Sequence, residues 1–170
     1  MRLSKIEYGC YLALAAKSRS EDPFTQVGAV ALSRENRILG TAYNGLKSGA
    51  VVQEWMLKED NRAKKSDLFI HVESNLCALL RKGECHTICL TQSPCIKCCQ
   101  NIAALDIKQV IYLQEYTKCN LFKEFFLFHG ISFLELPHES KEKIKQYIQN
   151  SANFFELESV RNCAKGVEKA

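Results

Sequence analysis

Four residues in two short segments carry the side chains that could do chemistry. His71 and Glu73 are separated by one residue, and Cys95 and Cys98 follow later in a P-C-x-x-C run. One imidazole and two thiolates are three ligands for zinc, which leaves the fourth position for water, as in catalytic sites. Glu73 is not needed as a ligand, so its carboxylate is free to move protons. These residue types predict a hydrolytic zinc site.

The elements expected around the two segments can bring these side chains together. Pro94 favours a helix start, and a helix is expected over residues 95–105. Cys95 and Cys98 would then share one face of the first turn, where the partial positive charge of the helix favours thiolates. His71 precedes a second expected helix, over residues 72–80. We therefore expect the metal ligands to come from two helix starts, with Cys99 facing away from them.

Other interpretations of the cysteine pair are weaker. A lone C-x-x-C could be a redox pair or half of a zinc ribbon. No second C-x-x-C lies nearby, and neither alternative explains the upstream H-x-E. A zinc-binding relic without activity remains as an alternative, because a motif does not prove turnover.

Strand-like and helical segments alternate along the rest of the chain. Strands are expected over residues 27–32, 38–43, 86–91, 109–113 and 131–136. Further helices are expected over residues 4–18, 120–128 and 141–155, and residues 51–65 form a helix or a lid. This alternation predicts a three-layer α/β/α fold. We expect one domain over residues 1–158 and a frayed tail over residues 159–170.

Composition excludes several classes of protein. The net charge of +4 is too small to indicate nucleic-acid binding, and the charged run 62–65 is interpreted as a solvated face. The start of the chain does not resemble a signal peptide, and no apolar run approaches the length of a membrane span. Nine cysteines without an export signal do not indicate disulfides. We therefore expect a cytoplasmic protein, or one of the host cytoplasm if the gene is viral.

The motifs, taken in order, resemble one family. H-x-E followed by P-C-x-x-C is the signature of zinc-dependent nucleobase deaminases. R-S-E-D-P at residues 19–23, T-Q-V-G-A-V at 25–30 and Y-N-G at 43–45 accompany it. Over residues 8–136 the chain thus resembles deoxycytidylate (dCMP) deaminases of the cytidine-deaminase-like superfamily. The resemblance implies a central five-stranded mixed sheet and the Zn²⁺-dependent hydrolysis of dCMP to dUMP and ammonia, with catalytic Glu73.

The resemblance also implies contacts with the base and the sugar. Asn44 would hydrogen-bond the sugar hydroxyl, the alternative being a turn asparagine in the left-handed conformation. The N–H of Val72 would hold the pyrimidine carbonyl, and the carbonyl of Ser93 would accept from the exocyclic amine. Tyr116 would pack on the nucleotide or only cover the sheet edge.

A nucleotide substrate also needs an anion site. Arg19 matches the family's arginine before S-x-D-P, and its guanidinium can bind phosphate oxygens in pairs, although a solvated surface arginine is the alternative. Lys118 is a second candidate.

The resemblance further implies homo-oligomers, from dimers to hexamers, and leaves open regulation by dCTP and dTTP. The competing functions are a cytidine, guanine or tRNA adenosine deaminase, and an inactive nucleotide-binding relative. The D-P-x-T-Q loop argues against the first three, and Glu73 argues against the last.

Overall fold

The protein is built on a five-stranded mixed sheet, and the computed structural model describes residues 2–116 and 121–151. The strands, in the sheet order β2-β1-β3-β4-β5, are β2 Ile38–Tyr43, β1 Gly28–Leu32, β3 Thr87–Leu90, β4 Gln109–Tyr112 and β5 Ser132–Glu135. Strand β1 is antiparallel to β2 and β3, whereas β3, β4 and β5 are parallel. The predicted sheet is confirmed.

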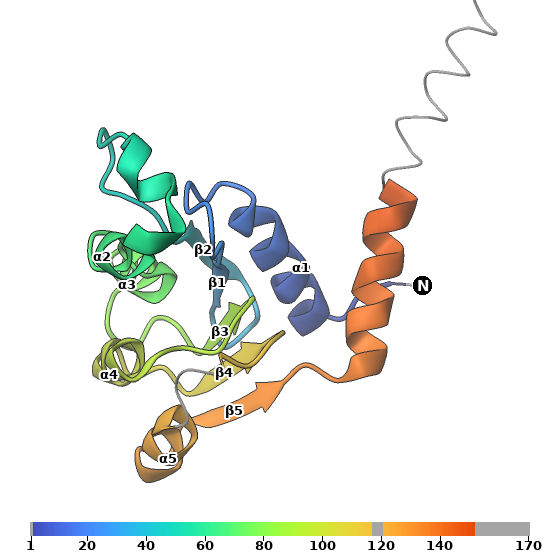
Figure 1. Cartoon of the computed structure of the whole chain (residues 1–170). Coiled ribbons are helices and arrows are strands. Elements are labelled where there is room, and N and C mark those ends of the chain that lie inside the picture. Colours follow the sequence, from blue (N-terminus) through green and yellow to red (C-terminus); the bar gives the residue numbers. More distant parts are fainter. Residues whose placement is uncertain (1, 117–120, 152–170) are drawn as a thin grey trace, which may run out of the picture.

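Helices cover both faces of the sheet (Figure 1). The helices that cover the two faces are α1 Lys5–Lys17, α3 Val72–Cys77, α4 Ile96–Ala104, α5 Leu121–Phe128 and a last helix over residues 138–151. Helix α1 and the last helix lie on one side, and α3, α4 and α5 lie on the other. This is the predicted three-layer α/β/α fold.

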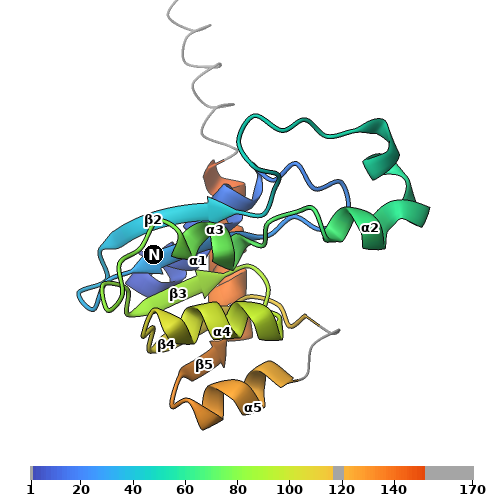
Figure 2. The ribbon, with the colours of Figure 1, turned by 90° about the vertical axis from the view of Figure 1, so that its left-hand side faces the viewer.

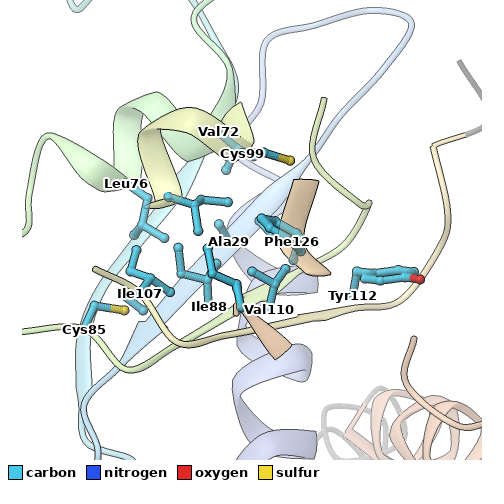
Figure 3. Packing of buried hydrophobic residues seen from close by; sticks show 14 of the residues in the cluster. Ala29, Val72, Leu76, Cys85, Ile88, Cys99, Ile107, Val110, Tyr112 and Phe126 are labelled. Carbon is cyan, nitrogen blue, oxygen red and sulfur yellow. The ribbon is translucent and has the colours of Figure 1, made fainter. Parts of the chain in front are cut away.

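Side-chain alternation along the strands explains the two cores. In β1, Ala29 and Ala31 belong to the core under α3, α4 and α5, whereas Val30 and Leu32 belong to the core under α1. Figure 3 shows the first of these cores, in which Leu76 of α3 and Phe126 of α5 approach Ile88 of β3 from the same side. A strand buried on both faces reads as a continuous apolar run, which is why β1 was recognisable from the sequence.

Helix α1 is fixed at its start and along its length. Ser4 is its N-cap and forms the reciprocal capping box with Glu7. Glu7 also receives a 2.8 Å salt bridge from Lys143, which joins α1 to the last helix. At Gly28 in β1, a Cβ atom would lie 2.0 Å from the Ala13 carbonyl oxygen, so only glycine lets the backbones of α1 and β1 approach this closely.

The segment over residues 46–70, between β2 and α3, stands out from the body of the sheet (Figure 2). It contains two 3₁₀ turns, Glu54–Leu57 and Glu59–Asn61, and the short helix α2 Arg62–Ser66. Residues 51–65 therefore do not form one continuous helix. The predicted solvated face over residues 62–65 is wrong at Lys65, which is 2% exposed.

Some expectations lie beyond what the structure describes. The end of the last helix at residue 155, the domain limit at 158, the tail over 159–170 and Lys118 all fall outside the described residues. Within residues 2–116 and 121–151, the helices are too short or too polar to cross a membrane.

Candidate active site

Two helix starts meet at the metal-binding motif. His71 is the N-cap residue of α3, and Cys95 is the N-cap residue of α4, with Cys98 in the first turn of α4. The Nδ1 atom of His71 lies 3.6 Å from Sγ of Cys95 and 3.3 Å from Sγ of Cys98. The two sulfur atoms are 3.5 Å apart. The structure thus brings together the three side chains that the sequence predicted as ligands.

These separations suit a tetrahedral zinc ion. Zinc bond lengths to sulfur and nitrogen place two sulfur ligands about 3.8 Å apart and a sulfur and a nitrogen about 3.6 Å apart. The donor atoms of His71, Cys95 and Cys98 all lie within 4.8 Å of one another, and no other such group of three occurs within the described ranges. One nitrogen and two sulfur donors leave a fourth corner for water, which is the pattern of a catalytic site.

The surroundings of Cys95 favour its ionised form. Hydrogen bonds from Cys98 and His71 lower the pKa of the Cys95 thiol to about 4, against the opposing effect of burial. The hydrogen bond with Cys95 raises the pKa of His71. The lowered pKa of Cys95 favours a thiolate at the start of α4, where the helix dipole also stabilises a negative charge.

Glu73 lies beside the ligands but is not one of them. It is in the first turn of α3 and only 4% exposed. Burial raises the pKa of its carboxyl group, although a hydrogen bond with Cys98 acts in the opposite direction. A carboxyl group held next to a metal site, and able to take either protonation state, has the chemistry of a general acid and base.

The site opens into a cavity of about 620 Å³. Its walls come from the loop before β1, the end of β2, the 46–70 segment, the start of α3 and the loops that follow β3 and β4. Seven of the nine predicted ligand, catalytic and substrate-binding residues line the cavity: Asn44, His71, Val72, Glu73, Ser93, Cys95 and Tyr116. Its volume is in the range that holds a small ligand.

Two loops are joined at one end of this cavity. The Ser93 hydroxyl accepts a 2.8 Å hydrogen bond from the N–H of Tyr116, and the Ser93 N–H donates to the carbonyl of Gln114. The loop after β4 is thereby fixed to the loop that leads into α4. Val72, in the first turn of α3, presents a backbone N–H that the helix itself does not use.

Asn44 is held in a dense set of hydrogen bonds at the end of β2. Its Oδ1 accepts from the Ser20 hydroxyl and from the N–H of Val27, at 2.8 and 2.7 Å. Its Nδ2 donates to the carbonyl of Thr25 at 2.8 Å and weakly to Asp22 at 3.5 Å. The left-handed alternative is wrong, because only Asn36 and Asp106 among the described non-glycine residues have positive φ. Asn44 thus organises the loop before β1 as well as lining the cavity.

Arg19 is not brought to the cavity. The side chain is exposed, and its guanidinium carbon lies 5.8 Å from the centre of the Tyr43 ring.

Cys99 faces away from the ligands, as expected, and is buried in the core under α3 and α4.

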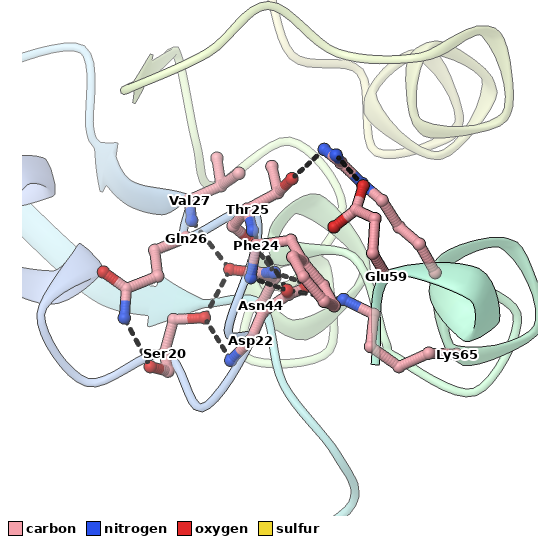
Figure 4. Close-up of polar contacts among 10 residues, drawn as sticks. Ser20, Asp22, Phe24, Thr25, Gln26, Val27, Asn44, Glu59 and Lys65 are labelled. Atoms are coloured by element: carbon pink, nitrogen blue, oxygen red, sulfur yellow. Dashed lines mark hydrogen bonds and ion pairs between the residues drawn. The ribbon is translucent and has the colours of Figure 1, made fainter. Parts of the chain in front are cut away.

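The cavity wall also contains a pair of charged residues that the sequence analysis did not predict. Lys65 of α2 forms a salt bridge with Asp22, and both side chains are almost completely buried. Figure 4 shows Lys65 pointing at Asp22, which lies against Asn44. Lys65 and the donated N–H groups of Thr25 and Phe24 lower the pKa of Asp22, although burial itself raises it. No spacing rule separates Lys65 from its exposed neighbour Lys64, so only the fold reveals this pair.

Comparison with known proteins defines first the fold and then the family. The structure matches apo dCMP deaminase of the cyanophage S-TIM5 with a TM-score of 0.61 and 21% identity, over 80% of this chain and 100% of that one. At this identity the likeness establishes the fold, which is that of the cytidine-deaminase-like enzymes.

Sequence comparison establishes the family. The chain belongs to the cytidine and deoxycytidylate deaminases, since the family model described as their zinc-binding region matches residues 3–114. The chain is 35% identical over 107 residues to a probable deoxycytidylate deaminase of Caenorhabditis elegans, covering 61% of this chain. It is 30% identical over 116 residues to human deoxycytidylate deaminase, covering 64% of this chain. The match spans 54% of the first relative and 64% of the second.

Proposed function

We propose that this protein hydrolyses dCMP to dUMP and ammonia at a zinc site formed by His71, Cys95 and Cys98. The observation that carries the proposal is the buried carboxyl group of Glu73 beside those three donors, in a cavity of ligand size. Family membership supports deaminase chemistry, and the names of the two relatives above support the nucleotide substrate.

The chemistry divides between the metal and the protein. A bound Zn²⁺ acts as a Lewis acid and lowers the pKa of water, so that hydroxide is available near neutral pH. Hydrolysis forms a C4–O bond and breaks the C4–N bond of cytosine. Of the two protons of water, Glu73 transfers one to ring nitrogen N3 and one to the departing amine, which leaves as ammonia. Glu73 is the catalytic residue of the proposal.

Four residues of the cavity wall position the nucleoside. The N–H of Val72 binds the pyrimidine carbonyl, the carbonyl of Ser93 accepts from the exocyclic amine, and Tyr116 packs against the nucleotide. Asn44 binds the sugar hydroxyl. Since its amide already has four partners, the sugar would replace the weakest of them, the 3.5 Å contact with Asp22.

The remaining expectations stay predictions. Homo-oligomers from dimers to hexamers are supported by apolar side chains exposed on α5, where Leu127 is 72% and Phe128 is 86% exposed. We also propose a cytoplasmic location and regulation by dCTP or dTTP.

A substrate panel tests the proposal. The zinc-loaded protein is assayed for ammonia release with dCMP, deoxycytidine, CMP and an anticodon stem-loop RNA, with and without a chelator. We expect dCMP to have the highest kcat/KM and the chelator to abolish turnover. The matched variant is Glu73→Ala, which should retain zinc and lose a factor of about 10² or more in kcat. An active Glu73→Ala protein refutes the role of that carboxylate, and zinc-loaded protein that releases no ammonia favours the inactive relative.

A further inference from the structure

The cavity contains more basic groups than the proposed chemistry uses. Besides His71, two basic side chains line it within the described part of the chain, Arg62 and Lys65, and both belong to α2. The acidic lining residues are Asp22, Glu59, Asp60 and Glu73. Two cations on one short helix at the cavity wall suggest that this helix faces an anionic part of the ligand.

Lys65 holds α2 in place, and its ammonium group is not available to bind a ligand. Its ammonium group forms the buried salt bridge with Asp22, which also accepts 2.8 and 3.0 Å hydrogen bonds from the N–H groups of Phe24 and Thr25. The aromatic rings of Phe24 and Phe69 lie 5.1 and 4.6 Å from its Nζ. Lys65 thus anchors α2 to the loop before β1, and its charge is already balanced.

Arg62 lies one helical turn before Lys65 in α2. The salt bridge of Lys65 therefore also holds the backbone of Arg62 in place. The guanidinium carbon lies 5.4 Å from the centre of the Phe24 ring, and Nη2 donates to the Thr25 hydroxyl at 3.4 Å. Nη1 pairs with Glu59 at 3.1 Å, but the two side chains are 45% and 66% exposed. Exposed pairs of this kind contribute little, so a doubly charged anion can replace Glu59. Three further N–H donors of the guanidinium remain for an incoming group.

We infer that Arg62 binds the 5′-phosphate of the substrate, so that α2 determines the preference for a nucleotide over a nucleoside. The inference rests on the proposed function. It differs from the prediction that the sequence made for Arg19, because Arg62 lines the cavity and Arg19 does not. The planar guanidinium lies over Phe24 and donates to Thr25 from one nitrogen, so its remaining N–H groups can bind phosphate oxygens in the paired geometry that arginine favours.

The test compares two substrates that differ only in the phosphate. The zinc-loaded parent, Arg62→Gln and Arg62→Lys are assayed for ammonia release with dCMP and with deoxycytidine. Arg62→Gln should raise KM for dCMP by about 10- to 100-fold, the usual effect of losing a hydrogen bond to a charged group. Its kcat for dCMP and its kcat/KM for deoxycytidine should stay within about twofold of the parent. Arg62→Lys should recover part of the loss, because it restores the charge but not the paired geometry.

Two further variants separate this role from others. Lys64→Gln removes the same charge from an exposed side chain whose Nζ lies 4.9 Å from the centre of the Trp55 ring and which does not line the cavity. It should leave kcat/KM unchanged for both substrates. Arg19→Gln tests the other arginine. The inference is overturned if Arg62→Gln affects both substrates equally, if Arg19→Gln alone raises KM for dCMP, or if the parent turns over deoxycytidine as well as dCMP. If the parent deaminates neither substrate, the proposed function itself has failed.

Discussion

Replacing Lys65 with methionine should detach the 46–70 segment from the body of the protein. The substitution keeps the aliphatic stem but removes the cation from Asp22, whose side chain is 6% exposed. Removing one partner of a buried ion pair costs about 3–5 kcal/mol, because the other charge stays buried without compensation. Asp22 retains the N–H groups of Phe24 and Thr25, so we expect the lower end, about 3 kcal/mol.

Trp55 makes this change measurable. It is the only tryptophan of the chain, and it lies in the first 3₁₀ turn of the segment. Urea unfolding of the zinc-loaded protein is followed by tryptophan fluorescence and by far-ultraviolet circular dichroism. In Lys65→Met the fluorescence transition should move to lower urea and precede the loss of helix signal, because the segment opens before the sheet unfolds.

The matched variants make the interpretation specific. Lys64→Met changes an exposed neighbour and should leave both transitions in place. Lys65→Met combined with Asp22→Asn should recover part of the loss, because the uncompensated charge is gone. A change below about 0.5 kcal/mol in Lys65→Met would show that the buried pair does not hold the segment, and the reasoning would fail.

Three other predictions test the scaffold and the metal site. Gly28→Ala should destabilise the protein by about 3 kcal/mol or more in thermal unfolding, because its Cβ would meet the backbone of α1. The control is Gly40→Ala in β2, where a Cβ would make only ordinary contacts and should be tolerated. Equal effects of the two substitutions would contradict this account. The pKa of Glu7 is lowered from 4.5 to about 2, because hydrogen bonds from Lys143 and Ser4 outweigh the effect of burial. Because the pKa is lower in the folded state, ionised Glu7 contributes on the order of 3 kcal/mol to the unfolding free energy above pH 4.5, and this contribution is lost as the pH falls toward 2. Glu7→Gln should abolish that part of the pH dependence of the unfolding free energy. Cys98→Ser should lose stoichiometric zinc by elemental analysis and unfold at lower temperature, while Cys77→Ser, outside the ligand group, should keep both; a zinc-loaded Cys98→Ser protein would refute the ligand assignment.

Local patterns were enough to predict the sheet and the arrangement of the metal ligands. The run over residues 27–32 is apolar at every position because β1 is buried on both faces, and Ser4 with Glu7 is a helix start that depends only on neighbours in the chain. The Cys95–Cys98 spacing brings two thiols together in one helical turn. Such signals are short-range, so a single sequence contains them.

The cavity wall could not be predicted in the same way. Lys65 meets Asp22 across 43 residues, and Arg62 reaches Thr25 across 37. Nothing in the charged run 62–65 indicates which of its side chains will be buried, because that depends on how the segment folds back over the loop before β1. For Arg19, the motif match predicted a contact with the substrate, but in the fold its side chain is exposed and lies over Tyr43, outside the cavity.

The way in which the 46–70 segment is attached has a consequence for engineering. An isolated bridge between Gly45 and Ile70 pairs the two ends of the segment, and between them Lys65 and Arg62 hold it against the loop before β1. The sheet and the metal-binding helix starts lie outside it. A designer could therefore exchange this module for one of another length or charge, keeping the anchoring lysine, and alter which ligands are admitted without redesigning the reaction centre.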